Sequence, residues 1–336
     1  MFDESVHNIL KRKNKIFALS VSFFALAFTV ARMVLTRFYT DPYVHYYYTD
    51  KANILVKFFD YIVGACIIAI YIASAFLYSR KKEKFKYIET VDCFVQGTQA
   101  QVFSASLTGF LFAFGAVFQA YNFIASGGPG EAWQKIRTAP FFTESIRQFM
   151  DSKFFACLKL LFSFDCLIFF FSILSAVYFF KTAALNFDVG KNIGNKPEPS
   201  DGNAGKKYSS AHIIFSFMPI VWSFLNIFKC FFDMSKSVNS PVRIYELVSF
   251  LAISAYFVSE SRMIVGRRET SRFFTYAYVS VIIAAMSSLP NLIWSSFWIL
   301  STNNDQIVYA VQIAVVIYIY SRIYSQVKYG RFSYQR

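Results

Sequence analysis

The chain has 336 residues, of which 56% are hydrophobic and only 16% are charged. Because soluble domains typically have about 25% charged residues, this composition argues against a soluble protein and favours a membrane protein. The formal net charge of +14 would also fit a nucleic-acid-binding protein. The basic residues lie in short segments between apolar stretches, however, so orientation in a membrane explains them better and no nucleic-acid partner is expected.

Eight apolar stretches follow one another along the chain. Most have about 20 residues or more, and a helix of that length crosses about 30 Å of hydrocarbon at roughly 1.5 Å per residue. Tyr61–Tyr78, for example, is apolar all round, as contact with lipid or with other helices requires. The sequence therefore predicts an all-α fold, a polytopic transmembrane helical bundle with about eight spans. The expected spans are 16–36, 53–78, 91–124, 154–180, 212–233, 244–265, 273–300 and 307–326.

Lys and Arg are concentrated in every other connecting segment. Lys and Arg number 22 on the side of the two termini, 8 on the opposite side and 4 within spans. In this count the C-terminal tail begins at Arg322. Since cytoplasmic loops have the excess of Lys and Arg, both termini are predicted to be cytoplasmic. The first span is expected to remain as a signal anchor, because it exceeds the usual apolar core of about 7–15 residues and no A-x-A-like site follows it.

The segment 181–211 has a different composition from the spans. Between Asn195 and Lys207 it consists of Pro, Gly, Ser, Asn and charged residues with a single Ala, which cannot bury apolar surface. We predict a disordered cytoplasmic linker at 181–211, between an N-terminal four-span half at 1–180 and a C-terminal four-span half at 212–336. Docking of a partner on this linker is the alternative interpretation.

Two further features concern the helices themselves. Near its inner end the third span contains polar residues that could either join helices by hydrogen bonds or line a water-filled passage. These residues are Gln96, Thr98, Gln99 and Gln101. Pro219 in the fifth span and Pro290 in the seventh lack a backbone N–H, so both are expected to kink their helices.

Ionisable residues within the spans are the main functional signal. A charge at the bilayer centre costs about 2.5–3.5 kcal/mol on insertion scales, so each such residue needs a partner, water or the interface. Arg32 and seven other residues are expected in the outer half of the bilayer or at its outer boundary. These seven residues, the candidate intramembrane polar site, are Lys57, Asp60, Lys159, Asp165, Lys229, Asp233 and Glu246. Together with Arg32 they have four charges of each sign, which indicates either a polar chamber or a layer of interhelical ion pairs.

Asp165 is the strongest candidate among them. With its span beginning at residue 154, it is expected some 16 Å deep, at roughly 1.5 Å per residue and close to the midplane. Its expected partner is Lys57 or Lys229 on a neighbouring helix, because Lys159 faces another side. Such a pair would be either structural or functional.

No motif of a P-loop ATPase, a serine hydrolase or a zinc protease occurs, and the five cysteines form no C-x-x-C, so no cofactor or metal is expected. Three classes fit. The first is a transporter or permease for a small solute or ion, with the charged outer-half residues as its chamber. The second is a sensor or scaffold that acts through a separate partner protein, and the third is a membrane-embedded enzyme acting on lipid substrates. The abundance of Phe, Tyr, Ile, Lys and Asn is typical of AT-rich bacterial genomes and predicts a bacterial cytoplasmic (plasma) membrane.

Overall fold

The computed structural model describes residues 4–39, 54–79, 97–125, 164–193, 208–232, 240–265, 270–295 and 303–329. Within these ranges nearly every residue is helical and no strand occurs, so the all-α prediction is confirmed. The helices are α1 (Glu4–Tyr39), α2 (Ile54–Ser79), α4 (Gln99–Ala125), α8 (Phe164–Ile193), α9 (Ser210–Ser216), α10 (Met218–Phe232), α11 (Pro241–Ile264), α12 (Thr270–Ser295) and α13 (Asn303–Tyr329).

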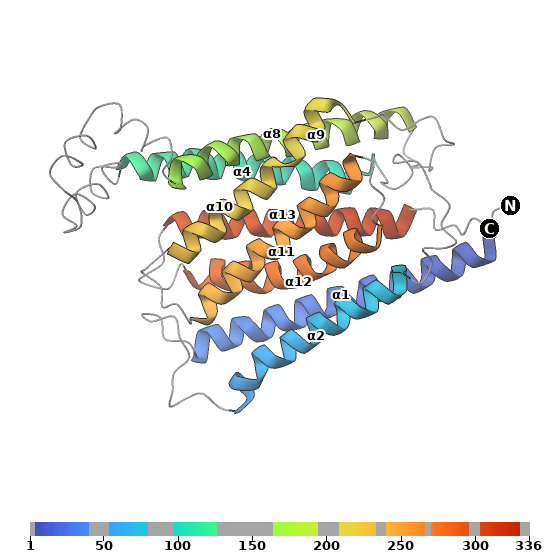
Figure 1. Ribbon diagram of the computed structural model, residues 1–336, viewed down its shortest axis with the longest axis horizontal. Coiled ribbons are helices and arrows are strands. Elements are labelled where there is room, and N and C mark those ends of the chain that lie inside the picture. The colour runs from blue at the N-terminus through green and yellow to red at the C-terminus, as the bar shows by residue number, and fades with distance from the viewer. Residues whose placement is uncertain are drawn as a thin grey trace, which may run out of the picture.

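Seven described stretches are long and apolar enough to cross a membrane, with α9 and α10 together forming one of them. The remaining pass is α2, which has 26 residues and an apolar described stretch at Phe58–Ser74. Successive passes run in opposite directions, so the start of α1 and the end of α13 lie at the same end of the bundle (Figure 1). The chain is therefore a polytopic helical membrane protein. We call the end with Glu4 and Tyr329 the inner end and the opposite end the outer end.

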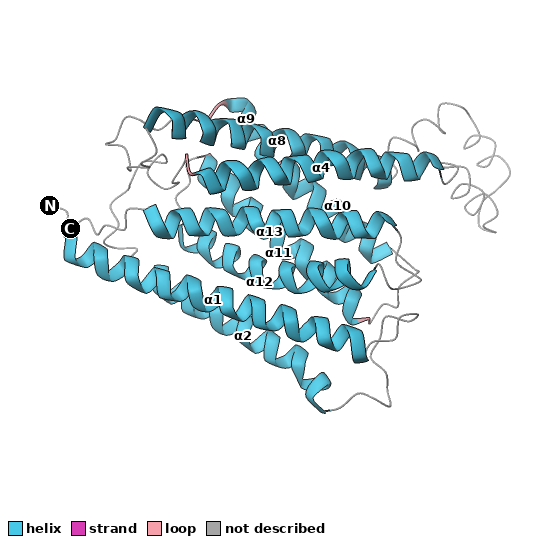
Figure 2. Cartoon of the chain, turned by 180° about the vertical axis from the view of Figure 1, so that it is seen from behind, coloured by secondary structure: helices cyan, strands magenta, loops and turns pink. Residues whose placement is uncertain are grey.

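The bundle consists of a central group and two flanking pairs of helices (Figures 1 and 2). The central group is α10, α11, α12 and α13. On one side of it α4 packs along α8, and this pair contacts α13 and α10. On the other side α1 and α2 pack mainly against α12. Helices from the two predicted four-span halves thus interleave, and the division of the chain at a linker remains a prediction, because residues 194–207 lie outside the described residues.

Helix α8 differs most from the predicted spans. The fourth span was expected at 154–180, whereas the described helix runs from Phe164 to Ile193. Beyond residue 180, Thr182, Asn186 and Val189 recur at helical spacing and are buried, so the helix continues as a packed element with a partly polar face. The predicted linker at 181–211 is therefore too long by at least its first 13 residues, 181–193, and α9 already begins at Ser210.

The fifth pass is broken between α9 and α10, as the position of Pro219 predicted. Proline lacks the N–H that an unbroken helix would use here, and its ring crowds the preceding turn. The N–H of Ile220 donates to the carbonyl of Phe217 at 3.2 Å rather than to Ser216. The Ser216 carbonyl instead accepts a hydrogen bond of 2.9 Å from the hydroxyl of Ser261 on α11. A neighbouring helix thus satisfies a carbonyl that the break leaves without its intrahelical donor, as membrane interiors require.

Glycines allow α4 and α8 to meet closely at the inner end. Gly97, just before α4, has a φ of +85°, which only glycine adopts without strain. A Cβ built on Gly190 of α8 would lie 2.7 Å from the Gly97 carbonyl oxygen. The two backbones are therefore in direct contact at the level where the buried polar residues of the inner half begin.

Candidate functional site

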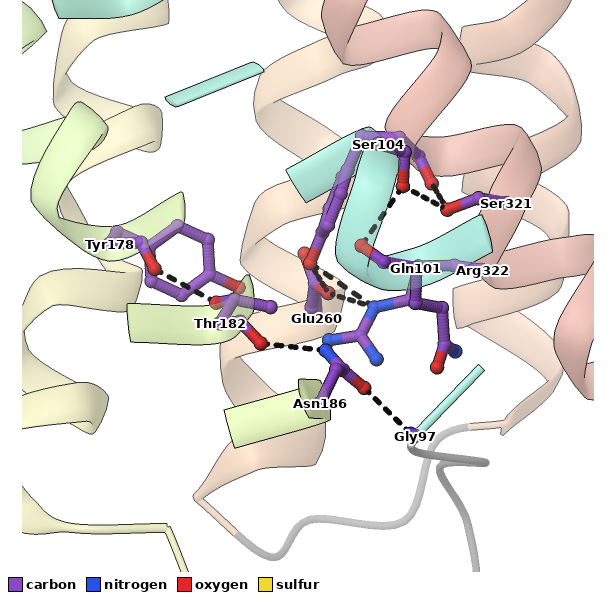
Figure 3. Close-up of polar contacts among 10 residues, drawn as sticks. Gly97, Gln101, Ser104, Tyr178, Thr182, Asn186, Glu260, Ser321 and Arg322 are labelled. Atoms are coloured by element: carbon purple, nitrogen blue, oxygen red, sulfur yellow. Dashed lines mark hydrogen bonds and ion pairs between the residues drawn. The ribbon is translucent and has the colours of Figure 1, made fainter. Parts of the chain in front are cut away.

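A carboxylate and a guanidinium meet inside the inner half of the bundle (Figure 3). Glu260 is in the last turns of α11 and Arg322 in the last turns of α13. Arg322 Nε lies 3.3 Å from Glu260 Oε1, and the two side chains are 2% and 1% exposed. The same oxygen of Glu260 accepts a 2.7 Å hydrogen bond from the hydroxyl of Tyr318, and Arg322 Nε donates to that hydroxyl at 3.1 Å. The three side chains form one closed network between α11 and α13.

An ion pair in this position is a poor stabilising device. Removing each charge from water costs several kcal/mol, and a hydrophobic replacement of similar volume is often neutral or stabilising. Ionisable residues inside membrane bundles accordingly tend to mark pathways for ions, protons or substrates. A pair kept for structure alone would also be expected to have all its polar atoms hydrogen-bonded.

Several polar atoms next to this pair lack a hydrogen-bond partner among the described residues. They are Oε2 of Glu260, the hydroxyls of Tyr178 on α8 and Tyr256 on α11, and Nε2 of His212 on α9. All four side chains are buried. The hydroxyls of both tyrosines face the Glu260 carboxylate without meeting the geometry of a hydrogen bond, and the ring of His212 is 5.3 Å from that of Tyr178.

Buried polar atoms nearly always have a partner, so a group of orphaned ones indicates a position that takes water or a ligand. We call Glu260, Arg322, Tyr318, Tyr178, Tyr256 and His212 the inner polar site.

Hydrogen bonds along α8 position the α8 side of the site. The hydroxyl of Thr182 donates to the carbonyl of Tyr178 at 2.9 Å, and Asn186 Nδ2 donates to the carbonyl of Thr182 at 2.7 Å. The amide oxygen of Asn186 accepts from the N–H of Gly97 at 3.1 Å (Figure 3). This chain fixes Tyr178 relative to the start of α4.

Hydroxyl groups join α4 to α13 beside the site. Ser104 and Ser321 are 2.6 Å apart through their oxygens, and Thr98 and Ser325 are 2.9 Å apart. One turn further out, Thr108 donates to the carbonyl of Ala314 at 3.0 Å. Of the polar residues predicted here, Thr98 and Gln101 are buried, Gln99 is exposed and Gln96 lies outside the described residues. Their role as helix-joining groups is confirmed for Thr98.

The described residues of the sequence-predicted site lie toward the outer end. Glu246 of α11 is buried, and its carboxylate accepts hydrogen bonds from the hydroxyl of Tyr309 on α13 and, at 3.4 Å, from the thiol of Cys230 on α10. Asp60 of α2 accepts a 2.7 Å hydrogen bond from the hydroxyl of Tyr245. The guanidinium of the buried Arg32 lies 3.5 Å from the centroid of the same tyrosine ring, which therefore bridges α1 and α2.

Asp165 and Lys229 form an ion pair of 2.7 Å, which confirms one of the two predicted partners. The expected depth is wrong. Lys229 belongs to the last turn of α10, and the two side chains are 49% and 37% exposed, so the pair lies near the outer end and on the surface of the bundle. The estimate that Asp165 lies near the midplane failed because α8 extends to Ile193. The centre of α8 is therefore further along the chain than the centre of a span that ends at residue 180.

The remaining predicted site residues, Lys159 and Asp233, lie outside the described residues, as does the side chain of Lys57. The described contacts join Asp165 with Lys229, Asp60 with Tyr245 and Arg32, and Glu246 with Tyr309 and Cys230. A single chamber formed by all of them remains a prediction.

Sequence reasoning missed the inner polar site. Arg322 was counted with the cytoplasmic tail, but it is enclosed within α13, and Glu260 was not singled out at all. Both residues lie inside predicted spans, 244–265 and 307–326. Their position inside a span was the available signal, together with Tyr318 four residues, or about one helical turn, before Arg322.

The site combines one carboxylate, one fixed cation and several groups that can both donate and accept hydrogen bonds. Within the described ranges no group of three His, Cys, Asp or Glu residues could hold a metal ion. Comparisons with protein-family models, with curated proteins and with solved structures gave no significant match. The chemistry of the residues is therefore the basis for a functional interpretation, and it suits a proton, water or a small polar solute.

Proposed function

We propose that the protein is a transporter of the permease type, in which polar side chains of α11, α12 and α13 form a path between Glu246 and the inner polar site. The observation that carries the proposal is a series of fully buried polar groups without hydrogen-bond partners among the described residues. A bundle that needs only stability would fill these positions with apolar side chains. The predicted location remains the bacterial cytoplasmic membrane.

One face of α11 provides the length of this path. Glu246, Ser249, Ile253, Tyr256 and Glu260 follow one another at intervals of three or four residues, so they share a helical face. All five are buried. From Glu246 to Glu260 the helix rises by roughly 21 Å, at about 1.5 Å per residue. This length is most of the thickness of the hydrocarbon layer.

Helix α13 contributes Gln312 to the same region. The contact between Tyr309 and Glu246 fixes how α13 and α11 are aligned. About one helical turn nearer the inner end, Gln312 of α13 is therefore level with Ser249 of α11. Gln312 is completely buried, and both its amide nitrogen and its amide oxygen lack a partner, as does the hydroxyl of Ser249.

Helix α12 contributes Ser287. The hydroxyl of Ser280 donates to the carbonyl of Ala252 at 2.6 Å, which aligns the antiparallel helices α12 and α11. Two turns from Ser280 toward the outer end, Ser287 reaches the level of Glu246. Its buried hydroxyl also lacks a partner. Three helices thus place orphaned polar groups at neighbouring levels.

The broken fifth pass supports the same function. Discontinuous helices are a recurring feature of secondary transporters, where they lie next to substrate and ion sites. Here the break at Phe217 follows His212 of the inner polar site by about one and a half turns. A sensor or scaffold needs no such arrangement, and a lipid-directed enzyme needs a polar site that a headgroup can reach, whereas Glu260 and Arg322 are enclosed.

The proposal can be tested with the purified protein in liposomes on a solid-supported membrane. Amino acids, small carboxylates, polyamines and alkali cations are applied in turn, and transport currents are recorded. We expect at least one class to give a current that Gln312→Leu strongly reduces. Gln99→Leu is the matched control, because the side chain of Gln99 on α4 is exposed. If no class gives a current above protein-free liposomes or shifts the melting temperature, the proposal is wrong.

A further inference from the structure

An apolar layer separates the outer polar groups from the inner polar site. On the shared face of α11, Ile253 stands between Ser249 and Tyr256. On α13, Val315 stands between Gln312 and the inner residue Tyr318. Ile253 and Val315 are both completely buried and belong to the hydrophobic core. From Ser249 to Tyr256 the helix rises about 10 Å, so polar groups on the two sides do not reach one another along this face.

We infer that the coupling ion is the proton, and that Glu246 and Glu260 are its two binding sites on opposite sides of a barrier formed by Ile253 and Val315. This inference rests on the proposed transport function. It goes further by naming the ion, the two residues that bind it and the layer that must open between them.

The chemistry of the inner polar site favours a proton over a metal cation. A bound Na⁺ or K⁺ would need several oxygen ligands, whereas here Arg322 already lies against the only carboxylate of the site and would repel a second cation. A proton needs one acceptor atom. Oε2 of Glu260 is that atom, because it is buried and has no hydrogen-bond partner in the described part of the chain.

The step is a simple proton transfer. An O–H bond forms on Oε2 as an O–H bond of a hydronium ion breaks, so the carboxylate becomes a neutral acid and a water molecule is left. Release reverses these changes, so one proton enters and one leaves without any change of oxidation state. Loss of the negative charge weakens the pairing of Glu260 with Arg322, which gives protonation a direct effect on how α11 and α13 hold together.

Titratable groups from several helices lie around the two carboxylates. Those around Glu260 include Arg322 and Tyr318 from α13, Tyr178 from α8 and Tyr256 from α11, and His212 of α9 lies against the ring of Tyr178. Those around Glu246 include Tyr309 from α13 and Cys230 from α10. Two described cations of that region, Arg32 and Arg243, contact the ring of Tyr245 and the carbonyl of Phe231.

The barrier provides the test. The full chain is reconstituted in liposomes that contain a pH-sensitive dye, and a K⁺ gradient with valinomycin drives proton entry. In wild type without solute, we expect little flux. Val315→Ser should raise it, because a hydroxyl lets water cross the layer. Val311→Ser is the matched control, since Val311 is a buried valine of the same helix that packs against Gly115 of α4, and it should leave the flux low.

The two carboxylates are then tested in the Val315→Ser protein. Glu246→Gln and Glu260→Gln should each lower the flux about a hundredfold, within the range that a positioned acid contributes to proton transfer. Asp188→Asn, which removes an exposed carboxylate of α8, should leave it unchanged. If Val315→Ser does not fold, the isosteric Val315→Thr replaces it.

Four outcomes are decisive. A folded barrier variant with wild-type flux, or a raised flux that neither Gln variant lowers, overturns the inference. Solute currents that are independent of pH reject the proton but keep the transporter. Carboxylate-dependent flux in Val315→Ser, with no solute current in wild type, supports the two proton sites and rejects the proposed function.

Discussion

Glu260 and Arg322 form an ion pair that helices enclose on all sides, and Tyr318 contacts both charged groups at once. The arrangement joins the inner halves of α11 and α13 through side chains, whereas α12 packs closely against each of these helices along its length. In the inner half of the bundle, the carboxylate of Glu260 therefore takes part in the direct contact between these two helices.

The first prediction concerns the stability of this pair. Glu260→Leu leaves the guanidinium buried without its carboxylate and should lower the free energy of unfolding by about 3–5 kcal/mol. Arg322→Met should cost less, because a carboxyl group can become neutral by taking up a proton and a guanidinium cannot lose its charge. The double variant should recover most of the loss. Thermal unfolding in detergent measures all three, and equal losses that simply add would show that the two residues are not coupled.

Asp165 and Lys229 should behave differently. Their pair is partly exposed near the outer end of the bundle, where exposed ion pairs contribute about 0–1 kcal/mol. Asp165→Asn should therefore change the melting temperature in detergent only slightly, and Lys229→Met should not act as a suppressor because there is little to restore. A large loss in Asp165→Asn that Lys229→Met reverses would instead establish this pair as a structural one.

The glycine contact at the inner end gives a third prediction. Gly190→Ala places a Cβ 2.7 Å from the carbonyl oxygen of Gly97, so the backbones must separate, at a cost of about 1–3 kcal/mol or more. Gly64→Ala on α2 is the control, because a Cβ there meets nothing within 4 Å. It should be neutral or stabilising by about 0.5–1 kcal/mol through helix propensity. The melting temperatures of the two variants in detergent test this prediction. Equal values would contradict a close contact between Gly97 and Gly190.

The orientation in the membrane can be measured directly. In a cysteine-free protein, single cysteines replace Ser126 and Ser200, which the basic-residue count assigns to the outside and the cytoplasm. A membrane-impermeant maleimide added to intact cells should label the first and spare the second. Permeabilised cells, in which both should react, are the control, and the reverse pattern in intact cells would invert the predicted topology.

The fold class was predictable because its causes are local. Length and apolarity of a segment determine whether it can cross a bilayer, and both can be counted in the sequence. Helix ends were harder, since Thr182 and Asn186 of α8 are polar by composition and are nonetheless buried against α4. Whether a polar residue ends a span or continues it depends on a neighbour that the sequence does not identify.

The candidate site was only partly predictable for the same reason. Asp165 stood out because it is a single charge in an apolar stretch, yet it lies on the surface, while Arg322 looked like part of a basic tail and lies inside. Depth along the chain is visible in a sequence, but the side of the helix that faces the bundle is not. The enclosure of Glu260 depends on Tyr318 and Tyr178, which come from two other helices.

The contact between Gly97 and Gly190 also restricts how this bundle can change shape. Two backbones that touch directly have no intervening side chains to change rotamer, so α4 and α8 cannot slide past each other at the inner end without losing the contact. They would turn as one rigid body. A rearrangement that opens the inner polar site would therefore move its other helices relative to this body, and the break between α9 and α10 gives the shorter segment a point at which it can bend.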